Sequence, residues 1–491
     1  MHQPRADSSG SRASNSAPTS DSLQDIWRIS GVTIAVLLGA LIWAMPTPDG
    51  LSIAGQRALS LFGGVFVLYL TEAIPLAAAS LLIVPLAVLT GVTTVKGALD
   101  GFSSSSAYLI VGAFILAVAM VRTHLAERIT YQILVRTGSS PTRITLGVTL
   151  VNIVLAFLVP SSTARTAILL PECLSILAIF GAEGRSKFAA NLLLTLTMTN
   201  ATIGAGILTA TVPNPVTVEF VAKADGHVIS YAEWLAYGFP PALLMTFVTW
   251  WLIQLVFRPE TRGLQSRVDE RIRENLAAMG ATSPAEWRTL AVFLAITLLW
   301  ATQGVTKLDT TVVCLLGVGV LFLPKIGVLD WDTASKGVSW QVLLIAGGGI
   351  SLGDMLLKTG AAAWLANAIF HGLGLGTAST LVVIVAVMLI VQFLHVIFVG
   401  TTAMATALLP IVLAMAGTAG VSPVALALPA GMIIGGYPLL MFYNTLPSVI
   451  VYGTGRLHVL DFPKVGIAIC LLACIVYALC AATFWRWLGL F

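Results

Sequence analysis

Charged residues are scarce in this sequence. Asp, Glu, Lys and Arg make up 10% of its 491 residues, whereas ordinary soluble domains contain roughly 25%. Hydrophobic residues make up 57%, and the mean hydropathy is +0.93. Apolar runs of about 20 residues recur from Ile29 to Leu488, each long enough to cross a bilayer as a helix. Since short segments of alternating polarity are lacking, the sequence predicts an all-α polytopic membrane protein in a lipid bilayer.

Residues suited to catalysis or metal binding are also few. The five cysteines lie in apolar segments without metal-ligand spacing, so we expect buried thiols, and the six histidines are equally dispersed. Neither G-x-S-x-G nor H-E-x-x-H occurs, so the sequence predicts no enzyme, no catalytic residue and no resident cofactor. The net charge of +4 is too small and dispersed to indicate nucleic-acid binding. No nucleotide-binding motif is present, which disfavours primary active transport.

The distribution of basic residues predicts the topology. Arginine and lysine gather at 122–143, 185–187 and 258–288, and by the positive-inside rule these connections are cytoplasmic. Residues 1–25 are Ser-rich and polar, which is typical of a disordered tail. We therefore expect an inner-membrane protein with a cytoplasmic N-terminus. The tail is followed by a first half at 26–257, a cytoplasmic linker helix at 258–288, and a second half at 289–491.

One apolar segment in each half is interrupted near its middle. Between Arg143 and Arg185 the chain must leave the cytoplasm and return, yet VPSST breaks the run. A re-entrant hairpin at 144–181 satisfies both facts, because irregular backbone at membrane depth survives only when buried in protein or lining a cavity. A second hairpin is predicted at 377–418.

The interruptions belong to an internal repeat. Ser161-Ser162-Thr163 matches Gly400-Thr401-Thr402 at an offset of 239 residues, and TVPN at 211–214 matches TLPS at 445–448. Because the predicted topology starts the two units on opposite sides, the repeats would be inverted, as in alternating-access transporters. The alternative is that small residues recur wherever membrane helices pack closely.

The doubled motif has the chemistry of an anion site. Each hairpin tip leads into a helix whose first N–H groups are unpaired, and Pro213 and Pro447 break two further spans. Hydroxyl groups add donors without the cost of a buried charge. The predicted substrate-binding residues are Ser161, Ser162, Thr163, Thr211, Pro213, Asn214, Thr401, Thr402, Thr445 and Pro447. The alternative for any single hydroxyl is a bond back to the preceding helical turn.

The same loops offer oxygen ligands for a cation. Sodium is a candidate coupling ion near Gly204 and Gly435, with Ser162 and Thr401 as further ligands. Asn200 could add an amide oxygen to the first of these sites.

Several motifs resemble the divalent anion/sodium symporter family: PSSTAR at 160–165, GTTA at 400–403, the paired TVPN and TLPS, and LTEAIPL at 70–76. The resemblance implies about eleven transmembrane helices plus two re-entrant hairpins, an elevator mechanism and a homodimer. The family's Ser-Asn-Thr signatures, which bind a substrate carboxylate and hold sodium, fall on residues 161–163 and 400–402. Both Asn positions are hydroxyl residues here, which puts sodium coordination in doubt.

Arg165 is similar to the T-A-R of the branch of this family that exchanges one dicarboxylate for another. There a fixed cation could take over the electrostatic role of sodium. The alternatives are that Arg165 pairs with Glu172 on the same helix or faces the cytoplasmic vestibule.

Four other polar or small-residue features have structural interpretations. We expect Glu72 to cap a helix start, Asp354 and Lys358 to form an i,i+4 ion pair, His395 to be a packing residue, and Gly347–Gly349 to allow close helix packing.

The combined hypothesis is a secondary active transporter of dicarboxylate-like anions. Its substrates would be small anions, namely C4-dicarboxylates, with citrate or 2-oxoglutarate as further candidates, taken up by sodium-coupled symport. The alternatives are a dicarboxylate exchanger (antiporter) that needs no sodium, and a permease for sulfate or another inorganic anion.

Overall fold

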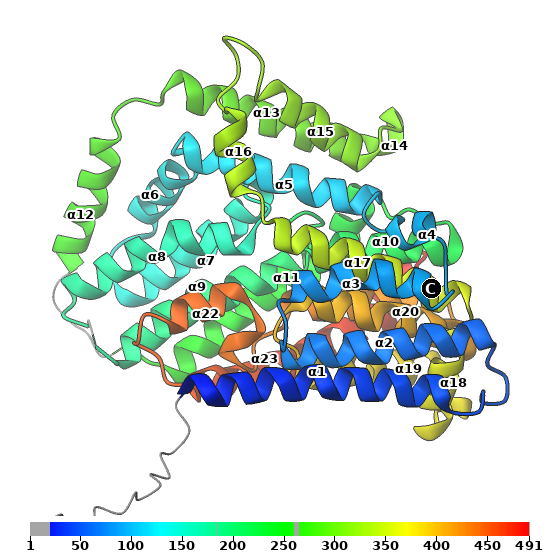
Figure 1. Cartoon of the computed structure of the whole chain (residues 1–491). Helices are drawn as coiled ribbons and strands as arrows, with labels where there is room; N and C mark the ends of the chain where they lie inside the picture. The colour runs from blue at the N-terminus through cyan, green and yellow to red at the C-terminus, as the bar shows by residue number, and fades with distance from the viewer. Residues whose placement is uncertain (1–19, 183, 260–264, 491) are drawn as a thin grey trace, which may run out of the picture.

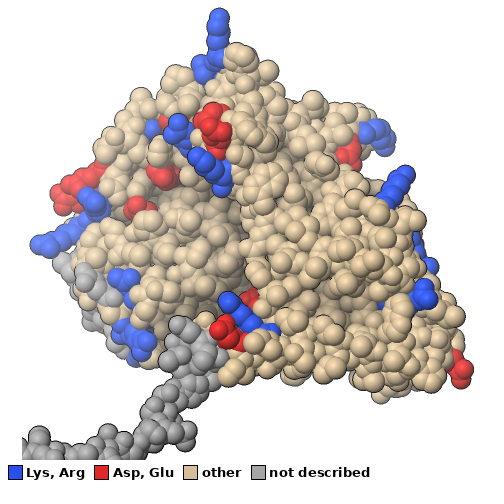
Figure 2. Space-filling model, viewed as in Figure 1, with Lys and Arg blue, Asp and Glu red and all other residues tan. Residues whose placement is uncertain are grey.

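A computed structural model describes residues 20–182, 184–259 and 265–490. Within these ranges the chain is all-helical and contains no strand (Figure 1). Among the described residues, nine helices are long and apolar enough to cross a membrane, and four apolar helices are shorter. On the face shown in Figure 2, charged side chains are few, and a broad uncharged area separates the groups on the left from those on the right. The fold class predicted from composition is confirmed.

The chain begins with three apolar helices. They are α1 (Ser20–Ala44), α2 (Ile53–Thr71) and α3 (Leu76–Leu89). The helix of α1 starts six residues before the predicted end of the disordered tail, so residues 20–25 are helical and that boundary was placed too late. Backbone hydrogen bonding extends the helix to residues that precede the apolar run, because the backbone groups of polar residues can also pair within a helix. The rest of the predicted tail, residues 1–19, lies outside the described ranges.

Helices α5 to α11 form the core of the first half, preceded by the short helix α4 (Val95–Leu99). Interruptions were predicted at 159–163 and around 202–215, and in the structure residues 159–161 and 205–212 separate helices there. In order, the seven are α5 (Ser105–Arg122), α6 (Leu125–Thr137), α7 (Pro141–Leu158), α8 (Ser162–Ile179), α9 (Lys187–Gly204), α10 (Pro213–Asp225) and α11 (Tyr231–Val256).

The middle of the chain connects the two halves. Helix α12 (Gln265–Ala278) lies in the segment predicted as a linker helix, and it packs against α6. It is followed by α13 (Pro284–Ala301), α14 (Gln303–Thr306), α15 (Thr310–Val320) and α16 (Trp331–Gly337). Figure 1 shows α13 to α15 at the top of the molecule, beside α5.

The second half repeats the helix order of the first. The elements are α17 (Trp340–Lys358), α18 (Ala361–Gly372), η1 (Leu375–Thr377), α19 (Thr380–Leu394), α20 (Thr401–Ala419), α21 (Pro423–Gly436), η2 (Phe442–Asn444), α22 (Leu446–Tyr452), α23 (Asp461–Ala482) and α24 (Phe484–Trp487). Helices α17 to α23 thus follow the sequence of α5 to α11, including both interruptions. The inverted relation of the halves and the elevator motion remain predictions.

Glycines let α17 approach its neighbours closely. A Cβ on Gly348 would lie 2.6 Å from the backbone oxygen of Ser80 on α3, and one on Gly349 would lie 2.3 Å from the side chain of Thr406 on α20. The packing role predicted for Gly347–Gly349 is therefore confirmed. At the end of the same helix, Lys358 Nζ lies 2.6 Å from Asp354 Oδ2, which confirms the predicted ion pair.

Candidate functional site

Both hairpin tips line one cavity of about 910 Å³. The first tip (residues 159–163) joins α7 to α8, and the second tip (residues 398–402) joins α19 to α20. The cavity also receives the first break (205–212, between α9 and α10) and the second break (437–445, between α21 and α22). The predicted site residues along it are Ser161, Ser162, Thr163, Arg165, Gly204, Thr211, Thr401, Thr402, Gly435, Thr445 and Pro447.

Two predicted substrate-binding residues do not line this cavity. Pro213 and Asn214 form the buried start of α10. The Asn214 amide donates to the carbonyl oxygens of Gly204, at 2.8 Å, and Ile207, at 2.9 Å. These bonds connect the start of α10 to the end of α9 and to the first break. The Asn214 Nδ2 is therefore tied to the loop, while its Oδ1 is buried without a partner among the described residues.

Residues of the first tip are held by local bonds. Pro160 interrupts the helix because proline has no N–H to donate. The Ser161 Oγ accepts a hydrogen bond from the Ala164 N–H at 3.2 Å and so caps α8. The hydroxyls of Ser162 and Thr163 bond to no other described residue, so they remain available to a ligand.

Arg165 is the buried cation of the site. Its side chain is completely buried, and the guanidinium donates to the Val159 carbonyl at 2.7 Å, to Asn200 Oδ1 at 2.7 Å, and to the Ala210 carbonyl at 3.3 Å. All three partners are neutral, and none of the ion pairs among the described residues involves Arg165. The guanidinium therefore joins the first tip to the first break and keeps its full charge beside the cavity.

Two sequence-based interpretations near Arg165 were wrong. Glu172 does not pair with Arg165, because its carboxylate accepts hydrogen bonds from the Tyr131 hydroxyl and the Asn275 amide. The Asn200 amide oxygen faces the guanidinium instead of a cation site, and its Nδ2 donates to the Ser162 carbonyl at 2.8 Å.

The second tip is held differently. Helix α20 begins at Thr401, and its N-cap residue Gly400 has no side chain to cap it. The hydroxyls of Thr401 and Thr402 bond to no other described residue. No arginine is present at this tip, where Met404 stands at the offset of 239 residues from Arg165. Asn444, a cavity-lining residue that the sequence did not single out, contacts the tip backbone instead.

At the starts of α10 and α22, which follow the two breaks, some backbone N–H groups already have hydrogen-bond partners. Thr445 Oγ1 accepts from the Ser448 N–H at 3.3 Å and caps α22. At the start of α10, Pro213 and Pro215 have no N–H groups, and the Asn214 N–H is bonded to the Thr211 carbonyl. The prediction that four free helix ends point at a ligand therefore needs correction. Among these four helix starts, only that of α20 has neither a side-chain cap nor a proline in its first two positions.

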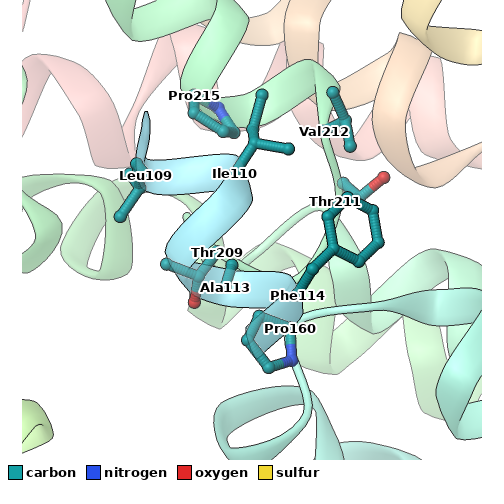
Figure 3. A pocket seen from close by; sticks show the side chains of 9 residues that line it. All are labelled: Leu109, Ile110, Ala113, Phe114, Pro160, Thr209, Thr211, Val212 and Pro215. Carbon is teal, nitrogen blue, oxygen red and sulfur yellow. The ribbon is translucent and has the colours of Figure 1, made fainter. Parts of the chain in front are cut away.

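A second, much smaller cavity of about 10 Å³ lies between α5 and the first tip. Figure 3 shows Ile110, Ala113 and Phe114 of α5 facing Pro160 and the first break. The Thr209 hydroxyl is buried there without a hydrogen-bond partner among the described residues. This volume suffices for about one water molecule, so the contact between α5 and the first tip is otherwise dry and apolar.

Residues outside the tips and breaks also line the large cavity. They include Phe114 and Val118 of α5 and Ile345 of α17, together with the carboxylate residues Glu72 and Glu127. Glu72 does not cap a helix start, as the sequence had suggested. It terminates α2 in a left-handed conformation, with φ of 47°, and α3 begins after Pro75 without a side-chain cap.

The comparison with known families decides the classification. Residues 25–491 match the model of the sodium:sulfate symporter transmembrane region. The chain belongs to this family. Transport across a membrane, and not catalysis, is therefore its activity, and the resemblance read from its motifs is confirmed.

The similarity of this sodium:sulfate symporter family member to its relatives extends over almost the whole chain. A membrane protein of Cupriavidus necator is 32% identical over 477 residues, covering 94% of this chain and 93% of the relative. The sodium-dependent dicarboxylate transporter SdcS of Staphylococcus saprophyticus is 29% identical, with 93% and 91% covered, and SdcS of Staphylococcus aureus is 27% identical, with 92% and 90% covered.

Two solved structures share the fold. The YdaH transporter of Alcanivorax borkumensis gives a TM-score of 0.54 at 12% identity, covering 95% of this chain and 98% of that one. MtrF of Neisseria gonorrhoeae gives a TM-score of 0.58 at 12% identity, covering 95% of both chains. At this identity the likeness concerns the architecture alone.

Proposed function

We propose that this sodium:sulfate symporter family member carries dicarboxylate-like anions, with C4-dicarboxylates as substrates, by sodium-coupled symport. The observation that supports the proposal most directly is the single cavity that receives both tips. Free hydroxyls at Ser162, Thr163, Thr401 and Thr402 and the buried charge of Arg165 make this cavity suited to an anion. The relatives named as sodium-dependent dicarboxylate transporters support the same substrate class and coupling ion.

Sodium is proposed at the second of the two predicted cation sites. Near Gly204, the guanidinium Nη2 of Arg165 lies 3.8 Å from the position that a Cβ would take, so a second cation would be repelled. Near Gly435, the buried Oδ1 of Asn214 has no partner among the described residues and lies 2.9 Å from the position of such a Cβ. This free amide oxygen supports the proposal of sodium beside Gly435 and Thr401.

Exchange of one dicarboxylate for another is the second candidate, and Arg165 favours it. A permanently bound cation next to the cavity can balance one substrate charge without any ion that must be carried along. In that case an empty carrier would return across the membrane poorly, because the charge of Arg165 would lack its counter-ion. Transport would then require substrate on both sides.

The coupling can be tested in proteoliposomes that contain the purified full-length protein. We expect labelled succinate to accumulate when an inward sodium gradient is imposed, and to stay at background level when choline replaces sodium. A second set of vesicles holds unlabelled succinate inside and has no sodium gradient. Uptake that requires internal succinate and ignores sodium would establish exchange and refute symport. No succinate uptake in either set would refute the dicarboxylate proposal.

The hydroxyls of the tips should contribute to substrate affinity. We expect Thr163→Ala and Thr402→Ala each to reduce succinate uptake about fivefold, because a hydrogen bond contributes about 1 kcal/mol. Thr→Ser at either position keeps the hydroxyl and should retain most of the activity. Thr418→Ala, at the far end of α20, is the matched control and should behave as the wild type. Unchanged Michaelis constants in both alanine variants would exclude these hydroxyls from the site.

A further inference from the structure

The loop that precedes the second tip turns three backbone carbonyls toward the second break. The Tyr443 hydroxyl donates to the Val396 carbonyl at 2.7 Å. The Asn444 Nδ2 donates to the carbonyl of His395 and, at 2.9 Å, to that of Phe398. Two neighbouring residues of the second break thus satisfy three backbone carbonyls between α19 and α20.

The orientation of the Asn444 amide is determined by its surroundings. The Met441 N–H donates to Asn444 Oδ1 at 2.9 Å, and since a backbone N–H can only donate, the oxygen must occupy this position. Nδ2 therefore faces the two carbonyls. Asn444 is 1% exposed, so these bonds are protected from water.

The first tip has an equivalent arrangement made by a different residue. Phe398 lies at the repeat offset of 239 residues from Val159, and the Val159 carbonyl is held by Arg165. Arg165 also binds the Ala210 carbonyl of the first break, so each tip is bonded to the break of its own half. A charged guanidinium makes this connection in the first half, and a neutral amide makes it in the second.

We propose that Asn444 is a positioning residue for the anion, equivalent in role to Arg165, which fixes the second tip so that its N–H groups and not its carbonyls face the cavity. Carbonyl oxygens carry partial negative charge and would repel an anion, whereas the uncapped start of α20 presents partial positive charge. By binding the carbonyls of His395 and Phe398, Asn444 keeps them turned away from the substrate. The proposal rests on the proposed transport of anions.

The test compares Asn444→Asp with wild type in the purified full-length protein. Aspartate keeps the shape and the acceptor for the Met441 N–H but lacks both N–H donors. We expect the Michaelis constant for succinate to rise at least tenfold, and amide hydrogen exchange to increase at 396–403 while it stays unchanged at 159–164. Tyr443→Phe removes one of the three bonds and should produce a smaller change of the same kind. Asn367→Asp, an exposed site on α18, is the control.

Two results would overturn the proposal. One is unchanged exchange at 396–403 in Asn444→Asp, or a Michaelis constant within twofold of wild type. The other is an increase in exchange spread over all helices, which would make Asn444 a residue of general stability. The exchange measurement needs no substrate, so it decides the role of Asn444 in the tip even if wild type carries no succinate and the proposed function fails.

Discussion

Arg165→Gln is expected to lower succinate uptake at least 100-fold at an unchanged amount of protein in the membrane. The substitution removes the buried cation that lines the cavity and leaves the acceptors of Val159, Asn200 and Ala210 without their donor. Each unsatisfied buried group costs about 1–3 kcal/mol, and about 1.4 kcal/mol corresponds to a factor of ten. Initial uptake rates in proteoliposomes, together with thermal unfolding of the same preparation, measure the effect.

Two companion variants separate charge from geometry. Arg165→Lys retains the charge but cannot present the planar fork of the guanidinium to three acceptors, so it should recover little activity. Arg185→Gln is the control, because Arg185 is exposed and its Nε donates to the Gly455 carbonyl at the surface. Uptake by Arg165→Gln within threefold of wild type would show that the guanidinium has no part in transport.

Glu286→Gln is expected to destabilise the folded protein by about 3 kcal/mol or more. Glu286 at the start of α13 is 2% exposed and forms an ion pair with Arg128 of α6, which is 6% exposed. The same guanidinium donates to the Gly280 carbonyl at 2.9 Å and so attaches the end of the linker to α6. Removing one partner of a buried ion pair leaves the other charge uncompensated, which typically costs 3–5 kcal/mol.

Thermal unfolding of the purified protein in detergent checks this expectation. Glu274→Gln provides the control, since Glu274 and Arg271 on α12 form an exposed pair at 4.0 Å, and exposed pairs contribute little. The unfolding midpoint should fall clearly in Glu286→Gln and remain near that of wild type in Glu274→Gln. Equal midpoints in the two variants would mean that the buried pair does not stabilise the junction.

Features that depend on neighbouring residues could be predicted from the sequence. The apolar runs predicted helices, and VPSST and TVPNP predicted interruptions, because proline and the lack of a continuous apolar face act within one or two turns. The first tip at 159–163 was found in this way, and the second followed from the repeat that matches Gly400-Thr401-Thr402 to the first. The structure brings both tips to one cavity. Helix α6 was missed, since its short amphipathic pattern was treated as part of the basic connection at 122–143, and α18 was not singled out.

The partners of the polar groups could not be predicted. Asn214 and Asn200 were expected to face ligands, but one closes the first break and the other binds Arg165. Asn444 was not predicted as a site residue, although its position directly before the TLPS motif could have indicated a role there. The bond between Asn200 and Arg165 joins residues 35 positions apart, and that between Asn444 and Phe398 joins residues 46 apart, so the packing of helices decides which donor reaches which oxygen.

The sequence by itself determined that this protein is a helical membrane protein with four interrupted segments, because hydrophobicity, charge distribution and proline act locally, and the repeated motifs at these interruptions indicated a transporter. Only the tertiary structure decided which groups remain free to bind an anion. A hydroxyl or an N–H group is available only when no nearby oxygen already accepts its hydrogen bond, and that depends on the positions of every neighbouring helix.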